Sequence, residues 1–397
     1  MSRIGIYIAI LLLFYLEIQG QKNIVDLHPE LVEQYERCLT SNDDRSKIPA
    51  LLRLLQDTLI NTGKSHLLLS LIPLYQKMES LPNVDPILIA KEYTKLAYVL
   101  KSIESFIDPS ITMYLKALYF SSLNPNRDDF WYIENVLGTL YNMKGDHERS
   151  LFYYQEAKDG IEKLILQNGD KSDSYRDQSL RLNNNIGYLY FWNKEYDKAE
   201  QVLNQNIKDA NLAENHIALA IGTRYLIELY IAQNQDHKAA ELLPIYKKQI
   251  EKLSGNKLTA EQTMYHVMNG QLQMKKYQYK DAIQSFSQAV ALYKYDNRDR
   301  FVAKNFNRLA QALLKDNQYK EAQTALVNGF KALHLKYPDF LHSPIVWNEE
   351  NTIAELLETQ TEWYQSKYWQ TKNKMLLDSA ITASRFAIDI YQQMRLK

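Results

Sequence analysis

The sequence predicts an all-α fold, built from helix-turn-helix repeats that occupy most of the chain. The first observation is a stripe of a small, a bulky and a small residue at offsets of four and seven. Those offsets place the three side chains on one face of a helix, where small residues let a second helix approach. Clear copies are Ser110/Tyr114/Ala117, Ser150/Tyr154/Ala157, Ala282/Phe286/Ala289 and Ala322/Leu326/Gly329; looser copies are Ala199/Leu203/Asn206, Ala239/Leu243/Tyr246 and Ala380/Ser384/Ala387.

The second observation is a matching pattern upstream of these stripes, which predicts the partner helix of each repeat. An aliphatic residue precedes a small one, and a bulky residue follows three positions later. Copies occur at Leu96/Ala97/Leu100, Leu137/Gly138/Tyr141, Ile186/Gly187/Tyr190 and Leu309/Ala310/Leu313. Short links, such as Gly145 to His147 and Tyr277 to Tyr279, join the two helices. A chain with this period is a series of small repeats.

The repeats resemble tetratricopeptide repeats, whose pattern of small and large residues is the one above. The resemblance covers residues 85–397 and implies a right-handed α-solenoid of about seven repeats. The stripes are spaced more widely than the roughly 34 residues of the standard repeat, so long helices or links are expected. Ala240 is an alternative to Ala239 as the first small residue of its stripe. Pro244 should kink or break its helix.

The N-terminus has the order of a secretory signal peptide: Arg3, an apolar run from Ile4 to Leu16, then small and polar residues. We expect residues 1–20 to be a signal peptide cleaved after Gly20, and the mature chain to be periplasmic, on the cell surface or secreted. There are two alternatives: an uncleaved signal anchor, or an apolar first helix of a cytosolic protein. Residues 21–84 should form an N-terminal cap of three helices, 31–39, 48–60 and 67–78, since a solenoid needs its end covered.

Composition and motifs argue against several functions. Lys and Arg total 47 and so do Asp and Glu, so the net charge gives no general attraction to nucleic acid or an anionic membrane. Membrane contact is expected only if the N-terminal segment is uncleaved. No metal-binding, nucleophile or nucleotide signature is present, so we expect no catalytic residue, metal, cofactor or small-molecule substrate. The sequence favours a protein that is not an enzyme.

The resemblance implies binding, because in tetratricopeptide proteins the first helix of each repeat lines a concave groove. Amide and guanidinium groups there hold backbone and carboxylate oxygens of a protein or an extended peptide. An apolar patch, Met264, Val267 and Met274, lies on the same predicted face. The candidate groove residues, counted from each aliphatic-small pair, are Asn135, Arg181, Asn184, Tyr188, Arg224, Glu228, Gln271, Lys304, Asn307 and Gln311.

The C-terminal segment, residues 351–397, has a second resemblance. It is similar to the last repeat before the caspase-like CHAT peptidase domain of bacterial regulatory proteins, but no His/Cys dyad of such a peptidase can be assigned. Two functions therefore remain open. The chain is expected to be an exported scaffold or adaptor that binds a protein or peptide in its groove. The alternative is a truncated or detached sensory arm of a CHAT-type peptidase or signalling protein.

Overall fold

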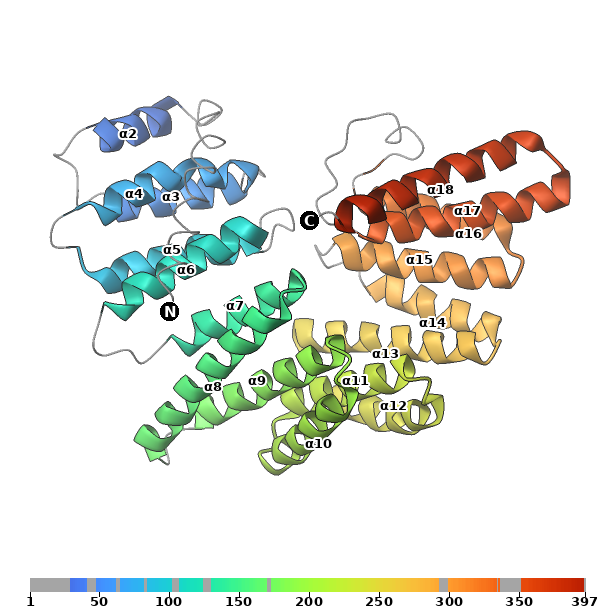
Figure 1. The fold of residues 1–397 in the computed structure, drawn as a ribbon, viewed down its shortest axis with the longest axis horizontal. Helices are drawn as coiled ribbons and strands as arrows, with labels where there is room; N and C mark the ends of the chain where they lie inside the picture. Colours follow the sequence, from blue (N-terminus) through green and yellow to red (C-terminus); the bar gives the residue numbers. More distant parts are fainter. Residues whose placement is uncertain are drawn as a thin grey trace. The chain divides into compact units, whose positions relative to one another are not determined.

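The protein is helical throughout the residues that its structure, a computed structural model, describes (Figure 1). These residues are 29–40, 48–61, 65–81, 84–101, 107–123, 130–169, 173–292, 299–333, 335 and 351–395. The chain divides into two compact units, Met1–Asn193 and Lys194–Lys397, here called the N-terminal and C-terminal units. The predicted signal peptide lies outside the described residues. Within them, no helix is both long and apolar enough to span a bilayer.

The N-terminal unit begins with helices where the apolar spacing predicts them. The third predicted helix starts as a 3₁₀ turn, η3, and continues as α4, which has a proline in its first turn. A continuous apolar core extends from Tyr35 in the first helix to Tyr153 in α8. The helices are α2 (Pro29–Thr40), α3 (Ile48–Asn61), η3 (Ser65–Leu71), α4 (Ile72–Glu79), α5 (Pro86–Lys101), α6 (Ile107–Ser122), α7 (Trp131–Met143), α8 (His147–Asn168) and α9 (Asp173–Trp192).

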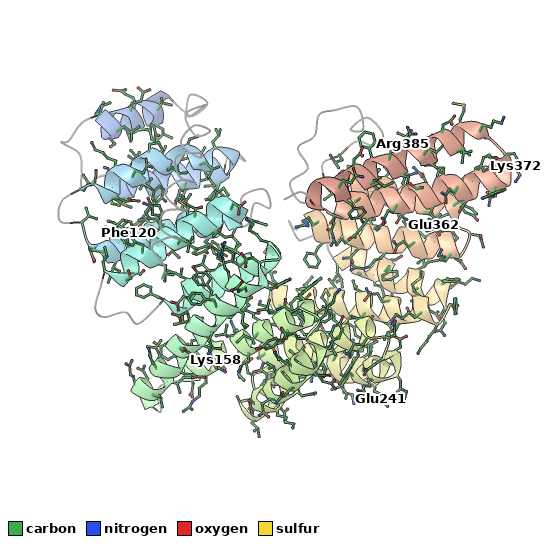
Figure 2. The ribbon with its side chains drawn as sticks, in the orientation of Figure 1. Phe120, Lys158, Glu241, Glu362, Lys372 and Arg385 are labelled. Atoms are coloured by element: carbon green, nitrogen blue, oxygen red, sulfur yellow. The ribbon has the colours of Figure 1, made fainter. Side chains whose placement is uncertain are left out.

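The C-terminal unit continues the alternation of first and second helices. One apolar cluster joins Ala303 of α15 to Ile390 of α18, so the last two repeats share a core. Side chains fill the space between helices (Figure 2). Glu362 of α17 forms an ion pair of 2.6 Å with Lys315 of α15. The helices are α10 (Tyr196–Leu212), α11 (His216–Ala232), α12 (Asp236–Ile250), α13 (Gly255–Lys275), α14 (Tyr279–Leu292), α15 (Asp299–Lys315), α16 (Tyr319–Ala332), α17 (Asn351–Thr371) and α18 (Lys374–Arg395).

The small residues of the signature lie where helices come closest. A β-carbon added to Gly138 of α7 would stand 2.5 Å from the ring of Tyr154 in α8, and one added to Gly270 of α13 would stand 2.6 Å from Phe286 in α14. Ser150, the first small residue of its stripe, donates a hydrogen bond of 2.7 Å to the Gly138 carbonyl. Ser110 does the same to Ala97 at 2.8 Å. The signature therefore fixes close packing within each of these repeats.

The links between paired helices share one backbone conformation. The first residue of each link has a positive φ, 75° at Gly145, 57° at Asn234, 59° at Tyr277 and 60° at Asn317. The next N–H then donates to a carbonyl five residues back, as Gln278 does to Gln273 at 2.9 Å. This is the Schellman ending of a helix, which turns the chain back without an unsatisfied carbonyl. Only Gly145 is the glycine that this conformation favours.

Pro244 does not break its helix, so the expectation of a break was wrong. Helix α12 runs unbroken from Asp236 to Ile250 with Pro244 inside it. The missing N–H costs only the hydrogen bond to the Ala240 carbonyl, and both residues line an open groove. The stripe of α12 starts at Ala239, which is fully buried, while Ala240 is only half-buried.

Candidate binding surfaces of the first helices

The predicted groove residues lie on the first helices of their repeats and fall into two groups, one in each unit. Asn135 of α7 and the α9 residues Arg181, Asn184 and Tyr188 belong to the N-terminal unit. Arg224 and Glu228 of α11, Gln271 of α13, and Lys304, Asn307 and Gln311 of α15 belong to the C-terminal unit. Each group therefore forms a surface of its own unit.

In the N-terminal unit, polar side chains link the first helices α7 and α9. The Asn185 side chain donates a hydrogen bond of 3.0 Å to Asn135 Oδ1. Asn184 is buried, at 1% exposed. The Tyr188 ring packs against Phe191 and Trp192, with ring centroids 5.6 and 5.9 Å away. Asn185, which the sequence reasoning missed, is therefore the residue that connects to Asn135.

Arg181 differs from its neighbours because its side chain pairs with no residue that the structure describes. Its Nε atom is buried and makes no hydrogen bond, and the guanidinium forms no ion pair with any described residue. An unsatisfied buried donor costs roughly 1–3 kcal/mol, more when charged. Such a cost is recovered when an acceptor arrives. Arg181 is thus the candidate residue on this surface with an open capacity for an anionic or carbonyl oxygen.

In the C-terminal unit, Arg224 is fully occupied. Its Nε lies 2.9 Å from Glu261 Oε2 of α13, and its Nη1 lies 3.0 Å from Glu228 Oε1. The Tyr246 hydroxyl of α12 donates to the same Glu261 oxygen at 2.6 Å. Burial alone would lower the pKa of Arg224, but Tyr225, Glu261 and Glu228 raise it well above its ordinary value. This network ties α11, α12 and α13 together.

Two of the remaining candidates, Lys304 and Gln311, contact a neighbouring first helix. Lys304 lies 3.8 Å from Glu355, and Gln311 donates to Thr359 Oγ1 at 3.2 Å, so both link α15 to α17. Asn307 is buried at 4% exposed, with an Oδ1 that makes no hydrogen bond. Gln271 is half-buried. Of the apolar patch, Val267 is buried, and Met274 packs against the cluster around Phe286. Ligand binding by these positions stays a prediction.

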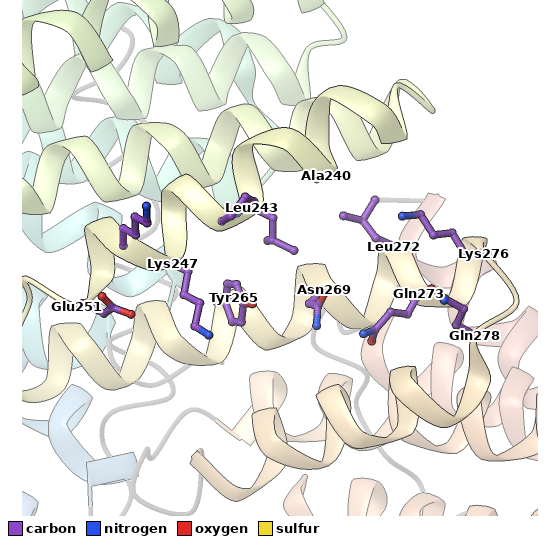
Figure 3. Close-up of a pocket in the computed structure, with 12 residues that line it drawn as sticks. Ala240, Leu243, Lys247, Glu251, Tyr265, Asn269, Leu272, Gln273, Lys276 and Gln278 are labelled. Carbon is purple, nitrogen blue, oxygen red and sulfur yellow. The ribbon is translucent and has the colours of Figure 1, made fainter.

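A second surface, which the sequence reasoning missed, is an open groove of about 660 Å³ between α12 and α13 (Figure 3). Its volume is in the range of ligand sites in proteins. It combines lysines and amides with a few apolar side chains. The lining residues are Ala240, Leu243, Pro244, Lys247, Lys248, Glu251, Tyr265, Asn269, Leu272, Gln273, Lys276 and Gln278. The described residues contain no group of three His, Cys, Asp or Glu side chains that could hold a metal ion.

No protein-family model matches the chain, and no curated protein matches it in sequence. Solved structures do match. RapI in its apo form is 14% identical, with 92% of this chain and 98% of that chain covered and a TM-score of 0.52. A Rap protein complexed with Competence and Sporulation Factor is 13% identical, with 88% and 99% covered and a TM-score of 0.51. A tetratricopeptide repeat protein from Parabacteroides merdae is 15% identical, with 67% and 99% covered and a TM-score of 0.36.

The chain has an all-α tetratricopeptide-like repeat fold. The resemblance that the signature predicted is therefore confirmed for the fold. At these identities the likeness concerns the fold and leaves the partners of this chain undetermined. The resemblance of residues 351–397 to the repeat before a CHAT domain stays a prediction.

Proposed function

We propose that this chain is an exported, non-enzymatic scaffold that binds a protein or an extended peptide on the first helices of its repeats. The observation that carries the proposal is Arg181, whose buried Nε makes no hydrogen bond and whose guanidinium pairs with no described residue on the surface formed by α7 and α9. The amides of Asn135 and Asn185 lie on the same two helices. A guanidinium binds a carboxylate or a main-chain carbonyl, and amides both donate to and accept from a peptide backbone.

The fold supports this proposal. Repeat proteins of this class present extended surfaces on which a second molecule can lie. One structure with the same fold is a Rap protein complexed with Competence and Sporulation Factor. We propose that the bound segment lies on the surface of α7 and α9 in this chain, because Arg181 is there.

The test is a capture experiment with the chain from Gln21 to Lys397 as bait and an extract of its own cell envelope. Arg181→Ala should lose the captured protein, because the guanidinium that meets its acceptor is gone. The matched control is Arg176→Ala, on the same helix, which removes an exposed arginine whose contact is to Asp173 in its own turn. Retention of the same partner by Arg181→Ala, or equal loss with Arg176→Ala, would contradict the proposal.

Export rests on the N-terminal residues alone. The basic, apolar and small-residue order from Arg3 to Gly20 directs secretion when it acts as a signal peptide. Expression of the full chain with a C-terminal tag should yield an envelope protein whose first residue is Gln21, determined by N-terminal sequencing. A cytoplasmic protein that starts at Met1 would exclude export, and an envelope protein that starts there would instead indicate a signal anchor.

A further inference from the structure

The groove between α12 and α13 exists because one first helix lacks the usual apolar pair. One position before the small residue and three after it, the other repeats have Leu137/Tyr141 around Gly138, Ile186/Tyr190 around Gly187 or Leu309/Leu313 around Ala310. In α13 the equivalent residues are Asn269 and Gln273, around Gly270. Two short polar side chains fill less space than an aliphatic and an aromatic one. Positions where a sequence departs from the apolar pattern of its fold without a gain in packing are often functional sites.

The side-chain amides of Asn269 and Gln273 are each fixed by one hydrogen bond to Ser285 of α14. The other polar atom of each amide makes no hydrogen bond with a described residue. Asn269 Nδ2 donates a hydrogen bond of 3.1 Å to Ser285 Oγ of α14, and Ser285 donates in turn to Gln273 Oε1 at 2.8 Å. Ser285 is buried, so the bridge is fixed inside the repeat. Asn269 Oδ1 and Gln273 Nε2 have no hydrogen-bond partner in the described part of the chain. One acceptor and one donor are therefore available to a peptide unit.

Three lysines border the same groove. Lys247 and Lys248 come from the last turn of α12, and Lys276 follows α13 directly. None of them forms an ion pair with a described residue; Lys247 has its Nζ 5.8 Å from the centre of the Tyr265 ring. Glu251 is the one carboxylate in the lining. The groove is thus positively charged in a chain whose total charge is balanced.

We propose that this groove binds an extended, acidic segment of a protein. Carboxylates of the segment pair with Lys247, Lys248 and Lys276, while its backbone meets Asn269 Oδ1 and Gln273 Nε2. Leu243, Pro244 and Leu272 supply the apolar contact that a bound chain needs to exclude water (Figure 3). The site belongs to the C-terminal unit and Arg181 to the N-terminal unit, so the proposal does not depend on the surface of α7 and α9.

The chemistry favours a protein segment over a chain of phosphates. Glu251 repels a dense string of negative charge, but it can accept a backbone N–H of a peptide. Two side-chain amides match the alternating donors and acceptors of a main chain. Nucleic acid is held mainly by phosphate contacts over a broad basic surface, whereas this charge is confined to one groove.

The first test measures fluorescence anisotropy of a short labelled peptide of alternating Glu and Gly, titrated with the full mature chain. The Glu peptide should bind in a salt-dependent manner, and the same peptide with Gln in place of Glu should not. Lys247→Gln combined with Lys276→Gln should weaken binding tenfold or more, since charged hydrogen bonds contribute about 1.5–3 kcal/mol each. Lys331→Gln on α16, an exposed lysine outside the groove, is the matched control and should bind as the native chain does.

A second variant tests whether the two amides are there for binding. Asn269→Leu with Gln273→Tyr restores the pair used by the other repeats. With Ser285→Ala added, which removes the hydroxyl that the two amides bonded, the melting temperature should rise because apolar contacts fill the groove, while binding of the Glu peptide should be lost. A variant that melts higher and still binds would exclude the groove as the site.

Other outcomes separate this proposal from the one above. No binding of the Glu peptide up to about 1 mM, or unchanged binding by the double lysine variant, would overturn the acidic-segment site. Tighter binding of tripolyphosphate than of the Glu peptide would overturn the choice of a protein ligand. Arg181→Ala should leave binding of the Glu peptide to the groove unchanged. The proposal for the groove and the proposal for the surface of α7 and α9 can therefore be contradicted independently of each other.

Discussion

Two arginines predicted to hold the same kind of ligand have opposite surroundings. Arg181 of α9 has a buried Nε with no partner, while Arg224 of α11 is clamped between Glu228 and Glu261. Both lie at the predicted groove position of a first helix, so their place in the repeat does not separate them. Arg224 is distinguished by two carboxylates of its own unit, Glu228 on α11 and Glu261 on α13. The same position holds the C-terminal unit together in one case and has no described partner in the other.

The strongest test of this difference between Arg181 and Arg224 is to remove each guanidinium. Arg224→Ala leaves Glu261, 6% exposed, without its counter-charge and should lower the free energy of unfolding by about 3–5 kcal/mol. Arg181→Ala should not lower it and should raise it by up to about 1–3 kcal/mol, because the change removes a buried donor that has no described partner. Urea denaturation followed by circular dichroism measures both. Adding Glu261→Gln to Arg224→Ala should cost less than the sum of the single changes; equal losses at Arg181 and Arg224 would end the distinction.

A second comparison concerns two glycines in equivalent positions of the two units. In Gly138→Ala the new β-carbon meets Tyr154, and in Gly270→Ala it meets Phe286, both at under 3 Å. Each change should cost about 1–3 kcal/mol by overpacking, in spite of the higher helix propensity of alanine. Gly160→Ala in α8 is the control, since its nearest neighbour is 3.4 Å away. It should be neutral or stabilise by up to about 1 kcal/mol, measured as a change in melting temperature.

The links give a smaller effect. Tyr277 has a φ of 59° and is 78% exposed, so Tyr277→Gly should stabilise the C-terminal unit by about 1 kcal/mol. Gly145→Ala, at a φ of 75°, should destabilise the N-terminal unit by a similar amount. Changes of opposite sign in the melting temperature would show that the two links differ only in how well their residue tolerates a positive φ. A loss of stability in Tyr277→Gly would mean that the tyrosine ring contributes contacts worth more than the strain.

The smallest effect is on pH. Burial, and next the charge of Lys247, lower the pKa of His266. The unfolded chain, with a histidine pKa near 6.5, then binds the proton more readily than the folded one. Stability is therefore retained above pH of about 6.5 and is lost as the pH falls below it towards the folded pKa. His266→Gln should flatten this part of the curve of stability against pH, and an unchanged curve would assign the dependence to other groups.

Local sequence predicted most of the fold because each repeat is fixed by contacts between residues close in the chain. Tyr114, Tyr154 and Phe286 are all buried at their stripe positions, and the links end their helices as the spacing requires. Pro244 was misjudged because the cost of a proline depends on what its missing N–H would have contacted, and the open groove makes that cost small. The 3₁₀ start of the third helix gave no sequence signal that we recognised.

The candidate sites were less predictable because they depend on residues distant in sequence. The sequence around Arg224 does not predict its ion pair with Glu261, which belongs to another repeat. The sequence around Arg181 likewise does not predict that this arginine lacks such an ion pair. The α12/α13 groove, in contrast, was visible in principle. Once Gly270 and Phe286 fix the register, Asn269 and Gln273 occupy positions where the other repeats have apolar residues.

Asn269 and Gln273 also have a mechanical consequence. A stack of repeats resists bending through the packed contacts between adjacent helices, and each joint contributes its own stiffness. A groove in place of an apolar contact leaves the joint between α12 and α13 to depend more on the polar contacts of Tyr246 and Arg224 with Glu261. A segment bound in the groove would then add contacts between α12 and α13. It would stiffen the C-terminal unit in addition to being its binding partner.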